Sequence, residues 1–178
     1  MRLISHPASI LLDKGVVRRV YEAQFRRAEG RLPTPEQMEA TEAFAQLIQS
    51  SYSLFIAEAS ANVLQLRRPQ FARLILNRTA VLSKGRYQRR WARRLRSFVF
   101  TREDAVIVSY GSFGQAPARN QLGVEMIVTT DFRMVTNYQT HFAAIKDRFD
   151  QMVVHLPAPY QQATLPQVIT PHTILTQW

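Results

Sequence analysis

The feature that most constrains the fold is the regular alternation of short apolar runs with longer segments of helical spacing. The clearest run, residues 126–130, reads Met-Ile-Val-Thr-Thr and ends at Asp131. Short apolar runs rich in β-branched residues are typical of buried strands. Further runs at 9–12 and 52–57 each precede a helical pattern. This alternation predicts an α/β fold with a mostly parallel central sheet flanked by helices.

The other expected elements follow from periodicity, caps and breaks. Thr34-Pro35-Glu36-Gln37 has the spacing of a capping box that opens a helix. We expect helices over residues 16–30, 35–50, 58–64, 71–82, 86–96, 101–114 and 142–149, and further strands over residues 97–100 and 153–154.

The chain length favours a single domain. The 178 residues are enough for one compact core but few for two. We expect this domain to cover residues 1–155. Residues 156–178 form a C-terminal tail whose prolines should discourage regular structure.

Composition narrows the class of protein further. No apolar run approaches 18 residues, so no membrane span is expected. The first residues lack the long apolar region of a secretory signal, and we expect a cytoplasmic protein. The absence of cysteine excludes disulfides and thiolate metal sites.

Positive charge is concentrated in one segment. Residues 67–102 hold 12 Lys or Arg and no Asp or Glu, whereas the whole chain has a net charge of +10. A segment of this kind favours phosphate backbones, since each neutralised phosphate releases counterions. A basic face that is simply exposed to solvent, or a surface that binds an acidic protein partner, would have the same composition.

The arginines are densest on the helix expected at residues 86–96. Tyr87, Trp91 and Leu95 recur every four residues, which predicts an apolar stripe packed on the core. Arginine pairs bidentately with phosphate and stacks on bases, although a helix on a membrane surface has a similar pattern. We predict that this helix contacts nucleic acid through Arg86, Arg89, Arg90, Arg93 and Arg94.

Three aspartates stand at comparable places in the predicted elements. Asp13 and Asp131 each follow a strand, and Asp104 lies in the first turn of a helix. In α/β sheets ligands gather at the carboxyl ends of the strands, where we expect these side chains to converge. Clustered carboxylates generally require a cation, and hard oxygen ligands favour Mg²⁺ or Mn²⁺. Such a cation activates water at a phosphodiester, so together with the basic segment the pattern predicts a metal-dependent nuclease.

Each aspartate also has a purely structural interpretation. Asp is a preferred N-cap, and both Asp13 and Asp131 precede expected helices. Thr101 and Asp104 have the spacing of a capping box. These roles alone require no metal.

Three sequence blocks stand in order along the chain: Ile10-Leu11-Leu12-Asp13, Thr101-Arg102-Glu103-Asp104-Ala105-Val106-Ile107 and Gly123-Val124-Glu125-Met126-Ile127-Val128-Thr129-Thr130-Asp131. In order and spacing they resemble the PIN-domain family over roughly residues 8–150. The resemblance implies a metal-dependent ribonuclease in which Asp13, Asp104 and Asp131 hold Mg²⁺ or Mn²⁺ and Thr130 is a polar neighbour. Many bacterial members are toxins of toxin–antitoxin pairs and dimers are common, which implies a possible antitoxin partner and a homodimer.

The chain departs from the family pattern at two places. The family usually has a glutamate on the helix after the second strand, where this chain offers Ala61 or Asn62, with Glu58 slightly earlier. Lys14 and Gly15 follow Asp13 in place of a small hydroxyl residue or asparagine. The alternative to a nuclease is therefore a catalytically degenerate PIN-like module that binds RNA or a protein. A phosphotransfer domain with Asp13 as nucleophile ranks last, because a second carboxylate is normally expected where Gly15 stands.

Overall fold

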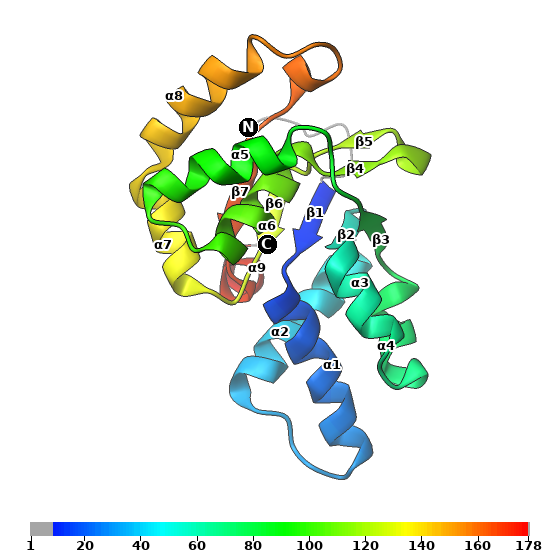
Figure 1. The fold of residues 1–178 in the computed structure, drawn as a ribbon. Helices are drawn as coiled ribbons and strands as arrows, with labels where there is room; N and C mark the ends of the chain where they lie inside the picture. Colours follow the sequence, from blue (N-terminus) through cyan, green and yellow to red (C-terminus); the bar gives the residue numbers. More distant parts are fainter. Residues whose placement is uncertain (1–8, 178) are drawn as a thin grey trace.

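The computed structural model describes residues 9–177 and has an α/β architecture built on a five-stranded sheet (Figure 1). Its strands are β1 (Ser9–Leu12), β2 (Ser53–Ala57), β3 (Ala80–Leu82), β6 (Met126–Val128) and β7 (Gln167–Ile169). The order is β3-β2-β1-β6-β7, and all neighbouring strands are parallel. The predicted α/β fold with a parallel central sheet is confirmed.

Nine α-helices accompany the sheet within the described residues. A separate two-stranded antiparallel sheet pairs β4 (Gln115–Ala116) with β5 (Gln121–Leu122). The helices are α1 (Lys14–Ala28), α2 (Pro35–Gln49), α3 (Glu58–Gln65), α4 (Pro69–Leu76), α5 (Gln88–Leu95), α6 (Arg102–Phe113), α7 (Phe132–Thr140), α8 (Phe142–Val153) and α9 (Pro171–Gln177).

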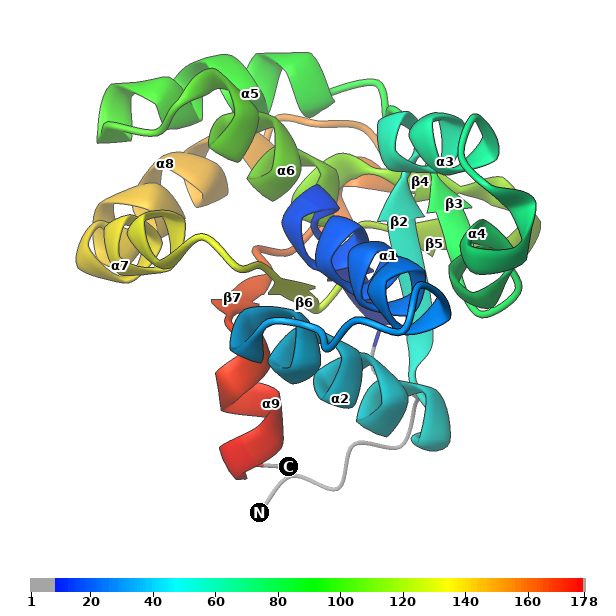
Figure 2. The ribbon, with the colours of Figure 1, turned by 90° about the horizontal axis from the view of Figure 1, so that it is seen from below.

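Helices cover both faces of the sheet, and alternate residues of the central strand point to opposite cores. Leu11 packs with α5, α6, α7 and α8, whereas Ile10 and Leu12 pack with α1, α2, α3, α4 and α9. Figure 2 shows α7 and α8 on one side of β6 and β7, and α2 and α9 on the other. This explains why the central strands are uniformly apolar, since both of their faces are buried.

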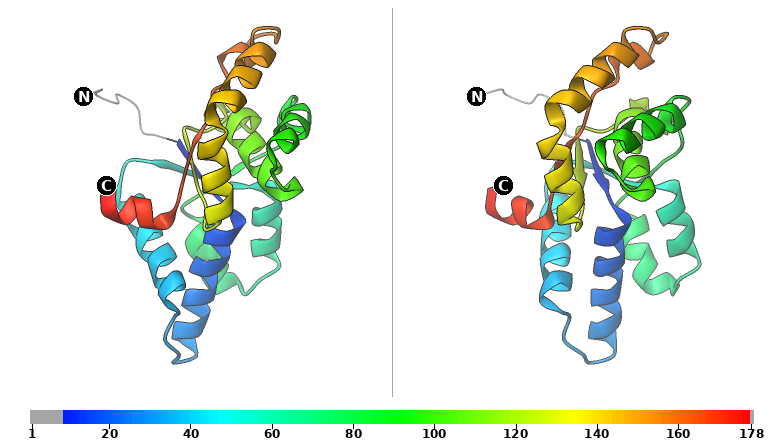
Figure 3. Two further views of the ribbon diagram at one scale, coloured as in Figure 1. Left: turned by 90° about the vertical axis from the view of Figure 1, so that its left-hand side faces the viewer. Right: turned by 60° about the vertical axis from the view of Figure 1, so that its left-hand side comes forward.

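The helix pair α1–α2 extends well beyond the sheet (Figure 3). Both predicted caps are present: the Asp13 carboxylate accepts the Lys14 N–H, and Thr34 and Gln37 form a complete capping box. Basic residues Arg26 and Arg27 occupy the last turn of α1, where they face the negative end of the helix dipole. The Asp13 cap fixes the start of α1 at the carboxyl end of β1.

Two sequence predictions between the second strand and α6 are wrong. Residues 97–100 are not a strand: Arg96–Phe98 forms a 3₁₀ turn, and Val99 has a left-handed backbone with φ 65°. The third strand is β3, which falls inside the helix expected over residues 71–82, because α4 ends at Leu76. A short apolar run does not distinguish a strand from a turn that buries its aromatic residues.

The C-terminal predictions also need correction. Val153 and Val154 are not a strand but the end of α8. The prolines of the tail predict a lack of regular structure, which is wrong: the tail supplies β7, which pairs with β6, and α9, which packs against α2. Its prolines lie outside the hydrogen-bonded core of β7 or at the first position of α9, where proline is tolerated.

Within residues 9–177, no helix combines the length and apolar character needed to cross a membrane. This agrees with the absence of an apolar run near 18 residues in the sequence.

Candidate functional site

The three aspartates predicted from the sequence line a single pocket, which we call the acidic pocket. It lies at the carboxyl ends of β1 and β6, strands that pair directly through Leu12 and Val128. The cavity has a volume of about 450 Å³. It is lined by Asp13, Lys14, Ala57, Ala59, Ser60, Arg102, Glu103, Asp104, Val106, Ile107, Tyr110 and Asp131.

Asp13 and Asp104 are partly buried, whereas Asp131 is exposed. Asp13 is held by two hydrogen bonds. Its Oδ1 accepts the backbone N–H of Lys14 at 2.7 Å, and its Oδ2 accepts the hydroxyl of Thr129 at 2.9 Å. Burial raises the pKa of this carboxyl above its ordinary value, and these hydrogen bonds only partly oppose the shift. The negative charge of Asp104 adds to it. The ionised form of Asp13 is therefore less stable here than in water, because the surrounding groups offset only part of its loss of solvation.

Asp131 and Asp104 are both engaged as helix caps. Asp131 Oδ1 accepts the N–H groups of Arg133 at 2.9 Å and Met134 at 3.0 Å. Asp104 Oδ2 accepts the Thr101 N–H at 3.3 Å, while the Thr101 hydroxyl accepts the Asp104 N–H at 3.1 Å. The predicted cap and capping box are confirmed. In each carboxylate the second oxygen has no hydrogen bond within residues 9–177, which leaves it available to a ligand.

The hydroxyl that joins two of the aspartates belongs to Thr129, not to Thr130. Thr129 is fully buried; its hydroxyl donates to Asp13 Oδ2 and accepts the Asp131 N–H at 3.1 Å. Thr130 instead lies against α1, where a Cβ added to Gly15 would come within 2.5 Å of its Oγ1. The sequence places two hydroxyls side by side, and only the strand register decides which one faces Asp13.

Glu103 adds a fourth carboxylate to the acidic pocket, and sequence reasoning missed it as a site residue. It forms an ion pair with Lys14, and both side chains are mostly exposed. The Lys14 ammonium lowers the pKa of Glu103. Lys14 forms its ion pair with Glu103, and its charge also lowers the pKa of Asp13, although by less than burial raises it.

The helix after the second strand begins at Glu58, directly after Ala57. Even so, Ala59 and Ser60 line the acidic pocket rather than Glu58. Ala61 is buried in the core and Asn62 is exposed. The glutamate that the family resemblance implies at this position has no counterpart among the residues that line the pocket. Glu58 nevertheless lies near it: the pKa of Tyr110 is raised mainly by burial and to a smaller extent by the charge of Glu58.

The donor set of the acidic pocket suits a hard cation, but its geometry is not a preformed metal cage. Carboxylate oxygens are the ligands that Mg²⁺ and Mn²⁺ prefer. Within residues 9–177, however, no three His, Asp or Glu side chains are gathered closely enough to hold a metal ion. A metal ion would be held by the free carboxylate oxygens of Asp104 and Asp131 and by the carboxylate of Asp13, whose charge is only partly stabilised by its neighbours.

A second cavity, which we call the basic hollow, adjoins the acidic pocket. Its volume is about 760 Å³. Ala59, Arg102, Val106 and Tyr110 line both cavities. The cations of the basic hollow are Lys84, Arg89, Arg93, Arg96 and Arg102.

The predicted nucleic-acid helix α5 divides its arginines between two faces. Arg89 and Arg93 line the basic hollow. Arg90 and Arg94 lie on another side of the helix, near Arg148 of α8. The pKa of Arg94 is lowered mainly by burial and further by the charges of Arg90 and Arg148. Arg86 lies over the ring of Tyr87, 5.5 Å from its centroid.

The apolar stripe of the same helix packs as predicted. Trp91 and Leu95 are fully buried, and Tyr87 packs against the core cluster from a partly buried position. The basic residues missed by the sequence analysis, Lys84, Arg96 and Arg102, all lie within the 67–102 segment. Arg96 and Arg102 flank the turn between α5 and α6, where the sequence predicts a strand, and Lys84 lies between β3 and α5.

No protein-family model matches this chain, and no curated protein matches it either. The geometry of the two cavities and the three sequence blocks are therefore the features that bear on function.

Proposed function

We propose that this protein is a metal-dependent endoribonuclease of the PIN type, with RNA as its substrate. One observation carries the proposal: carboxylates from three distant segments, at Asp13, Asp104 and Asp131, line one pocket that adjoins a hollow lined by five cations. Acidic groups suit the reaction at phosphorus, and the adjacent cations suit the rest of a phosphate backbone. An antitoxin partner and a homodimer stay predictions of the resemblance.

The side chains have distinct proposed roles. Asp104 and Asp131 would hold Mg²⁺ or Mn²⁺ through the oxygens left free by their caps, and Asp13 would contribute its undercompensated charge. A bound cation supplies water activation and neutralises charge that develops on the phosphate. Thr129 fixes the Asp13 carboxylate by its hydrogen bond. Arg102, which lines both cavities, is placed to hold the phosphate next to the one that is cleaved.

The deciding experiment is cleavage of a panel of single-stranded and structured RNAs in Mn²⁺, Mg²⁺ or EDTA. The wild-type chain should cleave internally only with metal. Asp131→Asn should lose about 10- to 100-fold in rate, an effect of the size seen when residues that support a metal site are changed. Asparagine is as good an N-cap as aspartate, so this variant should keep its fold.

Asp147→Asn is the matched control. Asp147 is an exposed carboxylate of α8 that accepts a hydrogen bond from Gln151, and it does not line the acidic pocket. Its rate should equal that of the wild type. Metal-independent cleavage, or equal rates for Asp131→Asn and Asp147→Asn, would refute the assignment.

A non-catalytic RNA-binding module is the second candidate. It is favoured by the capping roles of all three aspartates and by the lack of a preformed metal cage within residues 9–177. Tight RNA binding without cleavage in any metal would support it over the nuclease.

A further inference from the structure

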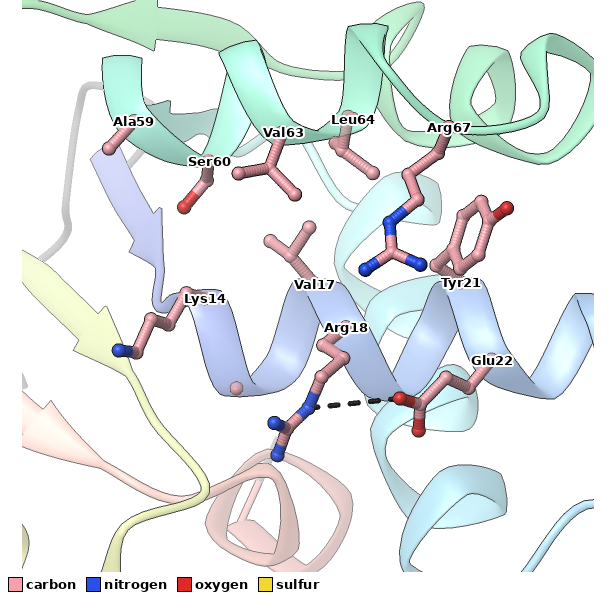
Figure 4. Close-up of a pocket in the computed structure, with 11 residues that line it drawn as sticks. Lys14, Val17, Arg18, Tyr21, Glu22, Ala59, Ser60, Val63, Leu64 and Arg67 are labelled. Carbon is pink, nitrogen blue, oxygen red and sulfur yellow. Dashed lines mark ion pairs between the residues drawn. The ribbon is translucent and has the colours of Figure 1, made fainter.

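A third cavity, which we call the apolar groove, runs between α1 and α3 (Figure 4). Its volume of about 340 Å³ lies at the lower end of the range of small-molecule sites, about 300–1,000 Å³. It is lined by Lys14, Gly15, Val17, Arg18, Tyr21, Glu22, Ala59, Ser60, Val63, Leu64 and Arg67.

The walls of the groove are apolar and face each other. Val17 of α1 and Val63 of α3 point toward one another in Figure 4, with Leu64 beside them. Val63 is 53% exposed, whereas Ala61 and Leu64 of the same helix are buried. Its exposed surface therefore belongs to the groove and not to the core.

One end of the groove offers a surface suited to a flat ring. The Arg67 guanidinium lies 5.9 Å from the centroid of the Tyr21 ring, and Arg67 has no ion pair within residues 9–177. Both aromatic rings and arginine guanidinium planes are platforms on which proteins stack unpaired bases.

Charge around the groove favours an anionic ligand. Three cations, Lys14, Arg18 and Arg67, and one carboxylate, Glu22, line the groove. Arg18 pairs with Glu22 at 3.9 Å and Lys14 pairs with Glu103, so Arg67 is the lining cation that has no ion pair within residues 9–177. An apolar slot with a cationic rim matches a nucleotide, whose base is flat and weakly polar and whose phosphates are charged.

The groove is continuous with the site of proposed cleavage. Lys14, Ala59 and Ser60 line both the apolar groove and the acidic pocket. Since the acidic pocket also adjoins the basic hollow through Arg102 and Tyr110, it lies between a cation-lined cavity and an apolar one.

We propose that the apolar groove is a nucleobase subsite, which takes one unstacked base of a single-stranded RNA beside the phosphate in the acidic pocket. The inference rests on the proposed RNA substrate but not on cleavage. It makes single-stranded RNA the substrate class, because a paired base cannot enter the groove. An amphipathic protein helix would use the apolar walls but would make no use of the flat guanidinium plane of Arg67.

The test is abasic scanning in EDTA, so that binding is measured without turnover. A fluorescein-labelled octaribonucleotide is titrated with protein, and each base in turn is removed while its ribose and phosphate are kept. For the wild type, removal at one position should weaken binding about five- to tenfold, as expected for loss of one stacked base. Removal at the other positions should have a smaller effect.

Three variants locate the lost contact. Val63→Trp fills the groove from an exposed position. It should weaken the binding of intact RNA about as much as removal of the critical base weakens binding to the wild type, and removal of any base should then have little further effect. Arg67→Lys should also lose the abasic effect but keep the salt dependence, since its charge is retained. Val154→Trp is the matched control, because Val154 is 66% exposed at the end of α8, outside the groove.

The outcomes separate the two proposals. If the wild type binds RNA but tolerates abasic sites equally, or if Val63→Trp keeps the abasic effect, the subsite is wrong and the nuclease proposal stands. If the wild type binds no RNA at low salt, both proposals fail.

Discussion

At the scale of single residues, Asp13 is the group whose environment departs most from that of an ordinary surface carboxylate. Burial raises its pKa above 3.8, the ordinary value for aspartate. Between this value and the raised one, the folded chain binds more protons than the unfolded chain. The free energy of unfolding therefore decreases as pH rises through that window, and the cost of the buried charge is fully present above it.

Asp13→Asn should remove this dependence. We expect the variant to gain stability relative to the wild type as pH rises from about 3.8 through the window, with each pKa unit of displacement corresponding to about 1.4 kcal/mol. Asparagine keeps the N-cap of α1. Urea unfolding across a pH series measures the difference, with Asp147→Asn as control. A difference between the two chains that does not change with pH would contradict the prediction.

At a pH above the raised pKa of Asp13, addition of Mg²⁺ or Mn²⁺ should reduce the difference in unfolding free energy between Asp13→Asn and the wild type. A cation near Asp13 stabilises its ionised form in the wild type, and Asp13→Asn lacks the charge that would respond.

At the scale of elements, α5 presents arginines of equal charge in two different environments. Arg89 and Arg93 line the basic hollow, whereas Arg90 and Arg94 lie toward Arg148. The double variant Arg89→Ala with Arg93→Ala should weaken RNA binding and reduce the salt slope by about 1.4, at about 0.7 per phosphate of a single strand.

Arg90→Ala with Arg94→Ala makes the same change of charge on the same helix and serves as the matched control. Its effect on affinity and on the salt slope should be smaller. Equal losses in the two double variants would show that RNA contacts the whole helix and not the basic hollow alone.

Elements buried on both faces were predictable from the sequence, and elements at the edge were not. β1 and β6 are wholly buried, so their residues form apolar runs that identify them. β3 has three residues, of which Val81 is 40% exposed, and it has no periodicity of its own. Residues 97–100 are apolar because Phe98 and Phe100 pack on the core around a turn at Val99.

The candidate site was predictable to the same extent. The convergence of Asp13 and Asp131 follows from the rule that parallel strands end at one edge, and the two strands are indeed neighbours. The choice of Thr129 over Thr130, and the pairing of Lys14 with Glu103, depend on register and on side-chain positions. Neither is encoded in a local pattern.

At the scale of the whole molecule, the C-terminal residues complete both the sheet and one core. Ile174 of α9 is fully buried in the cluster formed by α1, α2 and the sheet. Ile174→Ala should lower the free energy of unfolding by about 2–4 kcal/mol, as for other buried isoleucines cut to alanine.

Thr176→Ala is the control for this change. Thr176 is exposed on the same helix, and its hydroxyl donates to the His172 carbonyl. Its loss should change stability by less than about 0.5 kcal/mol. Urea unfolding measures both variants, and equal values for the two would mean that α9 contributes little to the core.

The hydrogen bond from Thr129 to Asp13 joins residues 116 positions apart, and this separation has a consequence for the order of events during synthesis. Chains emerge from the ribosome N-terminus first, so β1, β2 and α5 are available before β6 exists. A nascent chain stopped before residue 129 would already carry the arginines of α5 but would lack Thr129 and Asp131. The acidic pocket therefore becomes complete only after translation has passed these residues, whereas the cations that attract phosphate are exposed earlier.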